Sequence, residues 1–180
     1  MSVEQQIIIS GLGGQGVLFV TKLLAETAMA KKYKVLTSET HGMAQRGGIV
    51  ISYLKLGDFS GPLIRPGKAD ALIALKEETF HHHGYLVKDN GFCVVNSPSR
   101  IESSRFSVYS RDAETLAIKA GNPQSVNVVM LGYFTAALEK KCDVISLAGI
   151  SETIKRKLGG KKQVLESVLG LLESGYKLFD

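Results

Sequence analysis

Two segments near the start of the chain hold the residues whose types and spacing are best suited to chemistry. The first is a glycine-rich stretch, Gly-Leu-Gly-Gly-Gln-Gly, at positions 11–16. It follows three isoleucines at positions 7–9 and precedes a stretch in which apolar residues recur at helical spacing. Glycines at such a junction permit a tight turn, and the start of the helix attracts phosphate. We therefore predict a loop that binds a phosphate or another anion, formed by Gly11, Gly13, Gly14, Gln15 and Gly16.

The spacing of three of these glycines, Gly-x-Gly-x-x-Gly, is also the fingerprint of dinucleotide-binding folds. Such a fold needs an acidic residue about 20 positions further on to bind the ribose, and Glu39 lies near that place. Alternatively, the glycines only permit the turn or let a neighbouring backbone approach closely. The pattern alone leaves both interpretations open.

The second segment, at positions 38–48, reads Ser-Glu-Thr-His-Gly-Met-Ala-Gln-Arg-Gly-Gly and is polar without periodicity. We expect it to form an exposed loop after the second strand. Ligands of open α/β sheets bind beyond the carboxyl ends of the strands, so this loop should lie beside the glycine-rich one. Arg46 is suited to holding a carboxylate or phosphate through two hydrogen bonds, although an internal pair with Glu39 is the alternative. The residues proposed for an interface or shared site are Glu39, His41, Gln45 and Arg46.

No metal ligands and no catalytic residues are expected on this chain. Three consecutive histidines, His81, His82 and His83, point about 100° apart on a helix and cannot converge on one ion, so we interpret them as a solvent-facing helix end. Two cysteines, Cys93 and Cys142, are too few for a disulfide framework or for a four-cysteine iron–sulfur cluster.

The composition indicates a globular chain of 180 residues with 44% apolar residues. At roughly 150 residues per domain, this length predicts a single domain over residues 1–180. A net charge of +5 falls short of the clustered basic excess of a nucleic-acid-binding protein. The sequence contains no run of about 18 apolar residues, so it predicts no membrane span. The N-terminal residues lack the basic region of a signal peptide. We therefore expect a cytoplasmic protein with no nucleic-acid or membrane partner.

Strand-like and helix-like segments alternate along the whole chain. This alternation predicts an α/β fold: a Rossmann-like open, mostly parallel sheet with helices on both faces. Residues 7–9, 17–31 and 35–37 should form one βαβ unit. Asp112 and Asn127 are expected to cap the helices that follow them. Further helices are expected over residues 77–83, 147–158 and 163–176.

Two apolar stretches could serve either as core or as contact surfaces for another subunit. One is a seam at helical spacing near the C-terminus, which contains Leu165, Leu169, Leu172, Tyr176 and Phe179. The other is the short stretch Pro62, Leu63 and Ile64. We expect an exposed apolar patch somewhere on the surface of the isolated chain, and these two stretches are the candidates for it.

Taken together, the two N-terminal motifs resemble the gamma subunit of 2-oxoacid:ferredoxin oxidoreductases, a family whose members act on pyruvate, ketoisovalerate or indolepyruvate. The resemblance extends to residues 62–64, the Gly-Lys-Ala-Asp at 67–70 and the helix around 127–132. The His-Gly-Met-x-Gln-Arg-Gly-Gly form is most similar to the beta chain of indolepyruvate:ferredoxin oxidoreductase.

The resemblance implies a subunit of a larger enzyme that oxidatively decarboxylates a 2-oxoacid to an acyl-CoA. Thiamine diphosphate, [4Fe–4S] clusters and coenzyme A are expected in the complex, and no cofactor is expected on this chain. The implied partners are thiamine-binding alpha and beta subunits, a ferredoxin-like subunit, and ferredoxin as electron acceptor. In agreement, Gly57-Asp58 is followed by Phe59 and not by the glycine of the family's thiamine motif. The alternative is a dinucleotide- or anion-binding Rossmann domain that acts on its own.

Overall fold

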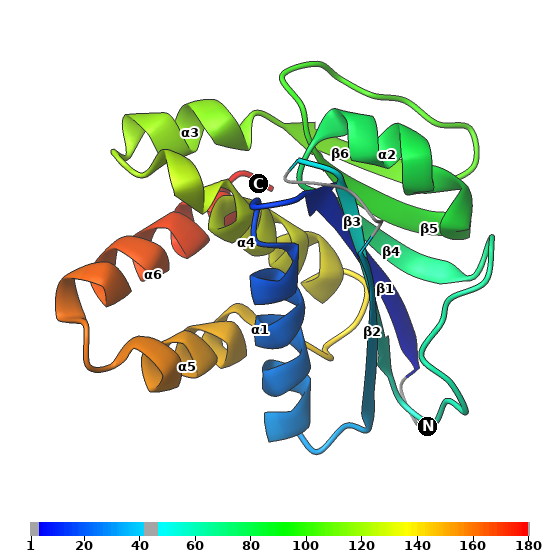
Figure 1. Cartoon of the computed structure of the whole chain (residues 1–180), viewed down its shortest axis with the longest axis horizontal. Helices are drawn as coiled ribbons and strands as arrows, with labels where there is room; N and C mark the ends of the chain where they lie inside the picture. The colour runs from blue at the N-terminus through cyan, green and yellow to red at the C-terminus, as the bar shows by residue number, and fades with distance from the viewer. Residues whose placement is uncertain (1–3, 42–46, 180) are drawn as a thin grey trace.

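A computed structural model describes residues 4–41 and 47–179 and places one mixed sheet at the centre of the molecule (Figure 1). Its strands lie in the order β2-β3-β1-β4-β5-β6. Their bounds are β1 Gln5–Leu12, β2 Val35–His41, β3 Ile49–Leu56, β4 Ala69–Ala74, β5 Val87–Asn96 and β6 Ser107–Arg111. The neighbours β1 and β4, β4 and β5, and β5 and β6 are parallel. The expected α/β architecture is therefore confirmed.

The expected βαβ unit needs a correction, because β1 and β2 are not hydrogen-bonded neighbours. Strand β3 lies between them and is antiparallel to both, with Ser52 opposite Ile9 on one side and opposite Glu39 on the other. The chain between His41 and Ile49 is too short for the crossover of about a dozen residues that parallel neighbours need. The two strands therefore pair antiparallel, and β3 occupies the place beside β1.

Helices cover the two faces of the sheet unequally. The helices α1 (Val17–Ala30) and α4 (Val126–Glu139) pack on one face, and α5 (Leu147–Leu158) and α6 (Lys162–Lys177) form a further layer outside them (Figure 1). The short helix α2 (Glu77–His83) lies on the other face, over β1, β4 and β5. The buried apolar residues accordingly form two clusters, one on each face. None of the helices in the described residues has the length and apolar character needed to cross a membrane.

Of the two predicted helix caps, Asp112 is confirmed and Asn127 is wrong. Asp112 precedes α3 (Ala113–Lys119) and accepts hydrogen bonds from the backbone N–H of Thr115, at 2.9 Å, and from its hydroxyl, at 2.6 Å. Asn127, in contrast, lies inside α4, which begins one residue earlier and is preceded by Ser125. The Asn127 side chain is turned toward the glycine-rich loop, as described below.

The C-terminal seam belongs to the core, and it does so through an unusually close helix crossing. Of its residues, Leu172 is fully buried, and Leu165, Leu169 and Phe179 are partly buried against the larger apolar cluster. A Cβ atom built at Gly132 of α4 would lie 2.0 Å from the carbonyl oxygen of Leu172. One built at Gly175 of α6 would lie 2.0 Å from the carbonyl oxygen of Val129, so each helix uses a glycine to approach the other's backbone.

The histidines at the end of α2 do not all face solvent, which corrects the expectation for His83. Its Nδ1 atom lies 2.7 Å from the hydroxyl of the fully buried Ser10 on β1. Burial lowers the pKa of His83, and the neighbouring His82 lowers it further. The last turn of α2 is thereby attached to the central strand through a half-buried, neutral imidazole.

We expect the two glycines of α6 to respond in opposite directions to substitution by alanine. Gly175→Ala places a methyl group against the α4 backbone and should lower the free energy of unfolding by about 1–3 kcal/mol or more. Gly170→Ala meets open space and should raise it by about 0.5–1 kcal/mol through helix propensity. Urea unfolding of both variants measures the difference, and similar effects at the two positions would contradict this packing.

His83 should also give the stability a dependence on pH. Because its pKa is lower in the folded than in the unfolded chain, where a histidine titrates near about 6.5, the unfolded chain binds the proton first. The contribution of the neutral His83 to the free energy of unfolding is therefore fully present above about pH 6.5, and it is lost progressively as the pH falls below that value. Melting temperatures between pH 7.5 and 5.5 should fall less for His83→Gln than for the wild type. An unchanged slope in His83→Gln would contradict this role of His83.

Candidate functional site

The glycine-rich loop joins the end of β1 to the start of α1 and combines an open backbone with a tightly packed one. Gly14 and Gly16 both adopt positive φ angles, of 95° and 80°. A Cβ atom at Gly16 would lie 2.2 Å from Nδ2 of Asn127, so this glycine docks the loop onto α4. A Cβ atom at Gly14 would meet nothing within 4 Å, which leaves the backbone of Gly14 accessible.

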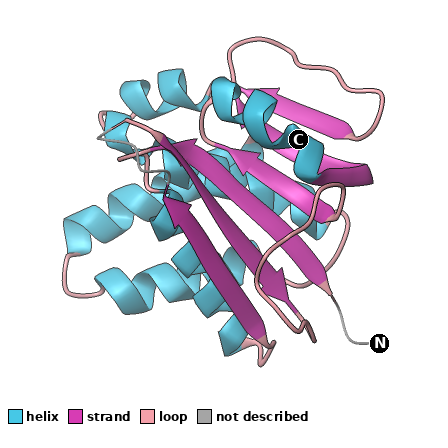
Figure 2. Cartoon of the chain, turned by 45° about the vertical axis from the view of Figure 1, so that its right-hand side comes forward, coloured by secondary structure: helices cyan, strands magenta, loops and turns pink. Residues whose placement is uncertain are grey.

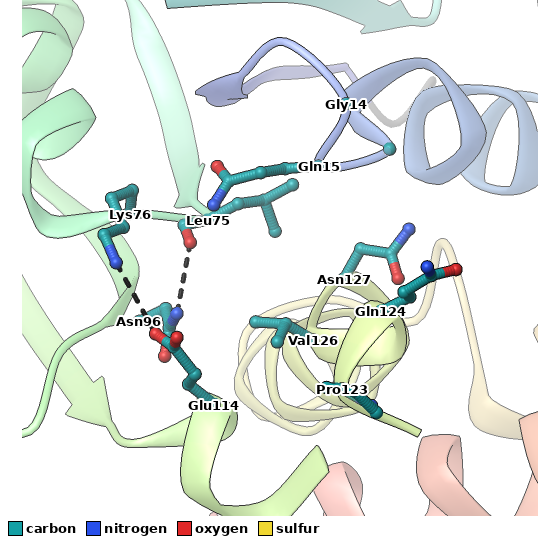
Figure 3. A pocket seen from close by; sticks show the side chains of 11 residues that line it. Gly14, Gln15, Leu75, Lys76, Asn96, Glu114, Pro123, Gln124, Val126 and Asn127 are labelled. Atoms are coloured by element: carbon teal, nitrogen blue, oxygen red, sulfur yellow. Dashed lines mark hydrogen bonds and ion pairs between the residues drawn. The ribbon is translucent and has the colours of Figure 1, made fainter. Parts of the chain in front are cut away.

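Gln15 shapes the loop with its own side chain. Its Oε1 atom accepts a hydrogen bond of 2.7 Å from the backbone N–H of Leu12, the last residue of β1. A Cβ atom at Gly11 would come within 3.0 Å of this oxygen, so the glycine gives the Gln15 amide its place. In Figure 3 the Gln15 side chain extends from the loop toward Leu75 at the end of β4.

The loop forms one wall of a cavity of about 460 Å³ at the carboxyl ends of β1, β4 and β5. The opposite wall comes from the start of α4 and the short 3-10 turn before it, with Gln124, Val126 and Asn127 (Figure 3). Leu75, Lys76 and Asn96, which follow or end β4 and β5, form its floor and side together with Glu114 of α3. This is the edge at which ligands bind in open α/β sheets.

The cavity contains a buried amide with two hydrogen bonds to the backbone, and an exposed ion pair at its mouth. Asn96 is buried, donates through Nδ2 to the carbonyl oxygen of Leu75 at 3.1 Å, and accepts from the backbone N–H of Ala113 at 3.0 Å. It thus ties the end of β4 to the start of α3. At the mouth, the ammonium group of Lys76 lies 3.5 Å from a carboxylate oxygen of Glu114, and both side chains are exposed. Lys76 thus brings a positive charge to the mouth of the cavity, and Glu114 brings the negative charge that it faces.

The second N-terminal segment is not wholly a loop. Residues Ser38–His41 continue β2 as far as His41, which pairs with Val50. Glu39 is exposed. Its strand, β2, is separated from β1 by β3, so at about 4.8 Å between neighbouring strands Glu39 lies about 10 Å from β1. Gln45 and Arg46 lie outside the described residues.

The two segments nevertheless meet, as their positions on the sheet predict. The backbone N–H of Gly13 donates to the carbonyl oxygen of Gly48 at 2.8 Å. A Cβ atom at Gly13 would lie 3.4 Å from the backbone nitrogen of Gly47. The end of the second segment is therefore held against the glycine-rich loop.

Sequence reasoning missed the other half of the cavity. Lys76 and Asn96 each stand at the carboxyl end of a parallel strand, so the rule that placed a ligand at this edge could have indicated them. Gln124 and Asn127 carried no comparable signal, because their place depends on how α4 packs across the loop.

The cavity suits an anion better than it suits a dinucleotide. The first turn of α1 carries no acidic side chain, and no side chain caps its N–H groups. The accessible backbone of Gly14 and the ammonium group of Lys76 add to this preference. Glu39, in contrast, lies too far across the sheet to bind a ribose beside the loop, which is what the fingerprint of a dinucleotide-binding fold requires.

The two cysteines do not fit the ligand set of an iron–sulfur cluster. Cys93 is buried within β5, and burial raises the pKa of its thiol far above the ordinary value. Burial raises the pKa of Cys142 as well. Among residues 4–41 and 47–179, no group of three or more His, Cys, Asp or Glu side chains is arranged to hold a metal ion.

Substitutions at the two left-handed glycines should separate backbone strain from steric contact. Gly14→Ala suffers only the strain of a left-handed alanine, about 1–2 kcal/mol. Gly16→Ala adds a clash with Asn127 and should cost roughly 1–3 kcal/mol more. Shortening the partner in Gly16→Ala/Asn127→Gly should recover part of that extra cost. Urea unfolding of the three variants measures these differences, and equal losses at Gly14 and Gly16 would contradict the contact.

The sequence is similar to a known protein family and to several characterised proteins. The family model described as pyruvate ferredoxin/flavodoxin oxidoreductase matches residues 6–178. The indolepyruvate oxidoreductase subunit IorB of Pyrococcus horikoshii is 36% identical over 73% of this chain and 77% of its own length. The protein of the same name from Archaeoglobus fulgidus is 29% identical over 94% of this chain and 92% of its own length.

A solved structure shares the fold. The crystal structure of the gamma subunit of a keto/oxoacid ferredoxin oxidoreductase from Geobacter sulfurreducens superposes with a TM-score of 0.79. The superposition covers 97% of this chain and 98% of that one, at 22% sequence identity.

Proposed function

The chain belongs to the pyruvate ferredoxin/flavodoxin oxidoreductase family, and from this premise we propose that it is the gamma-type subunit of a multi-subunit 2-oxoacid:ferredoxin oxidoreductase. In this proposal residues 1–180 form one domain, located in the cytoplasm, that assembles with other subunits and carries no catalytic residue of its own. The observation that carries the proposal is the family match over residues 6–178, almost the whole chain.

The chemistry of the reaction is assigned to other subunits. Thiamine diphosphate, bound between alpha and beta subunits, would supply the electron sink for decarboxylation of the 2-oxoacid. A ferredoxin-like subunit would hold [4Fe–4S] clusters and pass electrons to ferredoxin. Two features support this division of labour: the thiols of the buried Cys93 and the half-buried Cys142 are protonated, and Phe59 stands in place of a motif glycine.

The cavity beside the glycine-rich loop gives the chain a role in ligand binding within that complex. In this proposal Gly11, Gly13, Gly14, Gln15 and Gly16 form an anion site, and the phosphate groups of coenzyme A are the anions that the reaction brings. Lys76 supplies the positive side chain at the mouth of the cavity. Glu39, His41, Gln45 and Arg46 are assigned to an interface or shared site, since their segment ends against the loop.

Reconstitution tests this function. When the chain is co-expressed with thiamine-binding and cluster-binding subunits of its complex, the purified assembly should contain thiamine diphosphate and iron and should reduce ferredoxin in the presence of a 2-oxoacid. The isolated chain should be colourless and inactive. Stoichiometric iron and sulfide on the pure chain, or tight NAD or FAD binding with catalytic activity, would instead support an independent Rossmann domain and overturn the proposal.

The same assembly tests the anion site. Lys76→Ala should raise the KM for coenzyme A by up to about fivefold, because an exposed charge contributes up to about 1 kcal/mol. Glu114→Gln, which removes the carboxylate beside Lys76, is the matched control and should not raise it. An unchanged KM in Lys76→Ala would remove Lys76 from the site.

A further inference from the structure

A second concave surface lies at the opposite end of the central strands from the glycine-rich loop. It forms where β1 begins, where β3 ends, and where the loop over residues 57–68 leads from β3 to β4. This groove has a volume of about 520 Å³. We call it the basic groove, and its principal lining residues are Gln6, Lys55, Pro62, Leu63, Arg65 and Lys68.

Lys55 is the unusual member of this surface. It is a strand residue of β3 with only 9% of its surface exposed. Its ammonium group lies 4.9 Å from the centre of the Phe59 ring, a favourable contact that nevertheless leaves the charge without a counterion. Within residues 4–41 and 47–179, Lys55 has no ion pair and no side-chain hydrogen bond. The carbon stem of Lys55 is buried, whereas its ammonium group reaches the groove and is available to a partner there.

The other cations of the basic groove are unpaired as well. Arg65 and Lys68 are exposed, and neither forms an ion pair within the described part of the chain. Two acidic side chains on the segments after β3 and in β4 are already engaged. Asp58 pairs with Lys34 at 2.8 Å, and Asp70 pairs with Lys88 and accepts from the backbone N–H of Gln6 at 2.7 Å. The groove therefore combines three positive charges with no carboxylate among its lining residues.

Exposed apolar side chains lie beside these charges. Leu63 is 61% exposed, next to Pro62 in the same loop. Tyr85 is 57% exposed, and its carbonyl oxygen accepts from the backbone N–H of Gly67 at 3.2 Å, which places it alongside this loop. Of the three residues proposed as an apolar contact surface, Leu63 is exposed, Pro62 is half-buried and Ile64 is buried in the core.

The sheet itself continues this surface. In Figure 2 the face of β2 and β3 turned toward the viewer has no helix in front of it, and the 57–68 loop crosses the strands there. Tyr53 of β3 lies on this face with the smaller apolar cluster and is only partly buried. Burial raises the pKa of Tyr53, and Tyr85 raises it further.

We propose that the basic groove is the docking site for an acidic segment of a neighbouring subunit of the complex. A side-chain carboxylate of that segment pairs with Lys55, Arg65 and Lys68, and an adjacent apolar side chain packs on Pro62 and Leu63. A protein segment fits better than a free small anion because the charges adjoin an exposed apolar surface that a small anion would leave bare. This inference rests on the proposed function, which supplies the neighbouring subunit.

Zero-length crosslinking of the assembled complex tests the docking site. A carbodiimide joins a lysine to a carboxylate that it touches, so mass spectrometry should find Lys68 or Lys55 linked to an Asp or Glu of another subunit. Lys68→Arg keeps the charge and should lose its own crosslink without loss of assembly. A complex in which neither lysine is linked to a partner carboxylate would overturn the docking site.

Affinity measurements provide the second readout. Arg65→Glu should weaken binding of the partner subunits roughly 30-fold, and Lys55→Met should weaken it by a similar factor, because each removes one of the cations that pair with the partner's carboxylate. Lys155→Glu makes the same change of charge as Arg65→Glu, but on the exposed surface of α5 away from the groove. This variant should bind the partner subunits like the wild type. Melting curves verify that all variants are folded.

The outcomes distinguish this inference from the one on which it rests. If the wild-type chain forms no complex, the proposed function fails and the docking site fails with it. If a complex forms and Arg65→Glu and Lys55→Met bind as tightly as Lys155→Glu, only the docking site is overturned. Tight binding of inorganic phosphate or citrate in the groove, with partner affinity unchanged in those variants, would likewise replace the protein segment by a small anion.

Discussion

The hydrogen bonding of β1 on both of its edges is the constraint on which the rest of the structure depends. One edge pairs antiparallel with β3 along the whole strand, and the other pairs parallel with β4. Because both sets of backbone groups are satisfied, β1 cannot shift, and the chain must turn where the pairing ends at Leu12. The sheet therefore fixes where the glycine-rich loop begins. The contacts of Gln15 with Leu12, of Gly13 with Gly48 and of Gly16 with Asn127 then shape the loop and the cavity beside it.

The same strand divides the sheet into two halves with different environments. On one side the strands are parallel, and such sheets need cover on both faces, which α4 and α2 provide. On the other side β3 and β2 are antiparallel, and an antiparallel sheet tolerates an open face. The cavity at the glycine-rich loop belongs to the parallel half, and the basic groove opens from the antiparallel half. Two separate concave surfaces thus lie on either side of a single change of strand direction.

Local sequence patterns predicted the elements well and their neighbours less well. The bounds of α2 and α5 follow directly from periodicity, and Asp112 was recognisable as a cap because its carboxylate serves the next turn. The place of β3 depends on the hairpin that it forms with β2, which is a tertiary property. The same holds for Asn127, whose side chain fills the space that Gly16 leaves empty. For the candidate site, the glycine-rich loop was recognisable from its spacing, whereas Lys76 and Asn96 come from distant strands that only the fold brings beside it.

The burial of the two thiols has a practical consequence for handling the protein. A thiol reacts with maleimides and with disulfide reagents as its thiolate, and the raised pKa values of Cys93 and Cys142 keep both protonated near neutral pH. Cys93 is in addition enclosed in the core, and Cys142 is half covered. A cysteine introduced on the open surface would therefore react much faster than the native pair, so a fluorophore or spin label can be attached at a chosen position without first removing Cys93, whose loss would leave a cavity beneath the sheet.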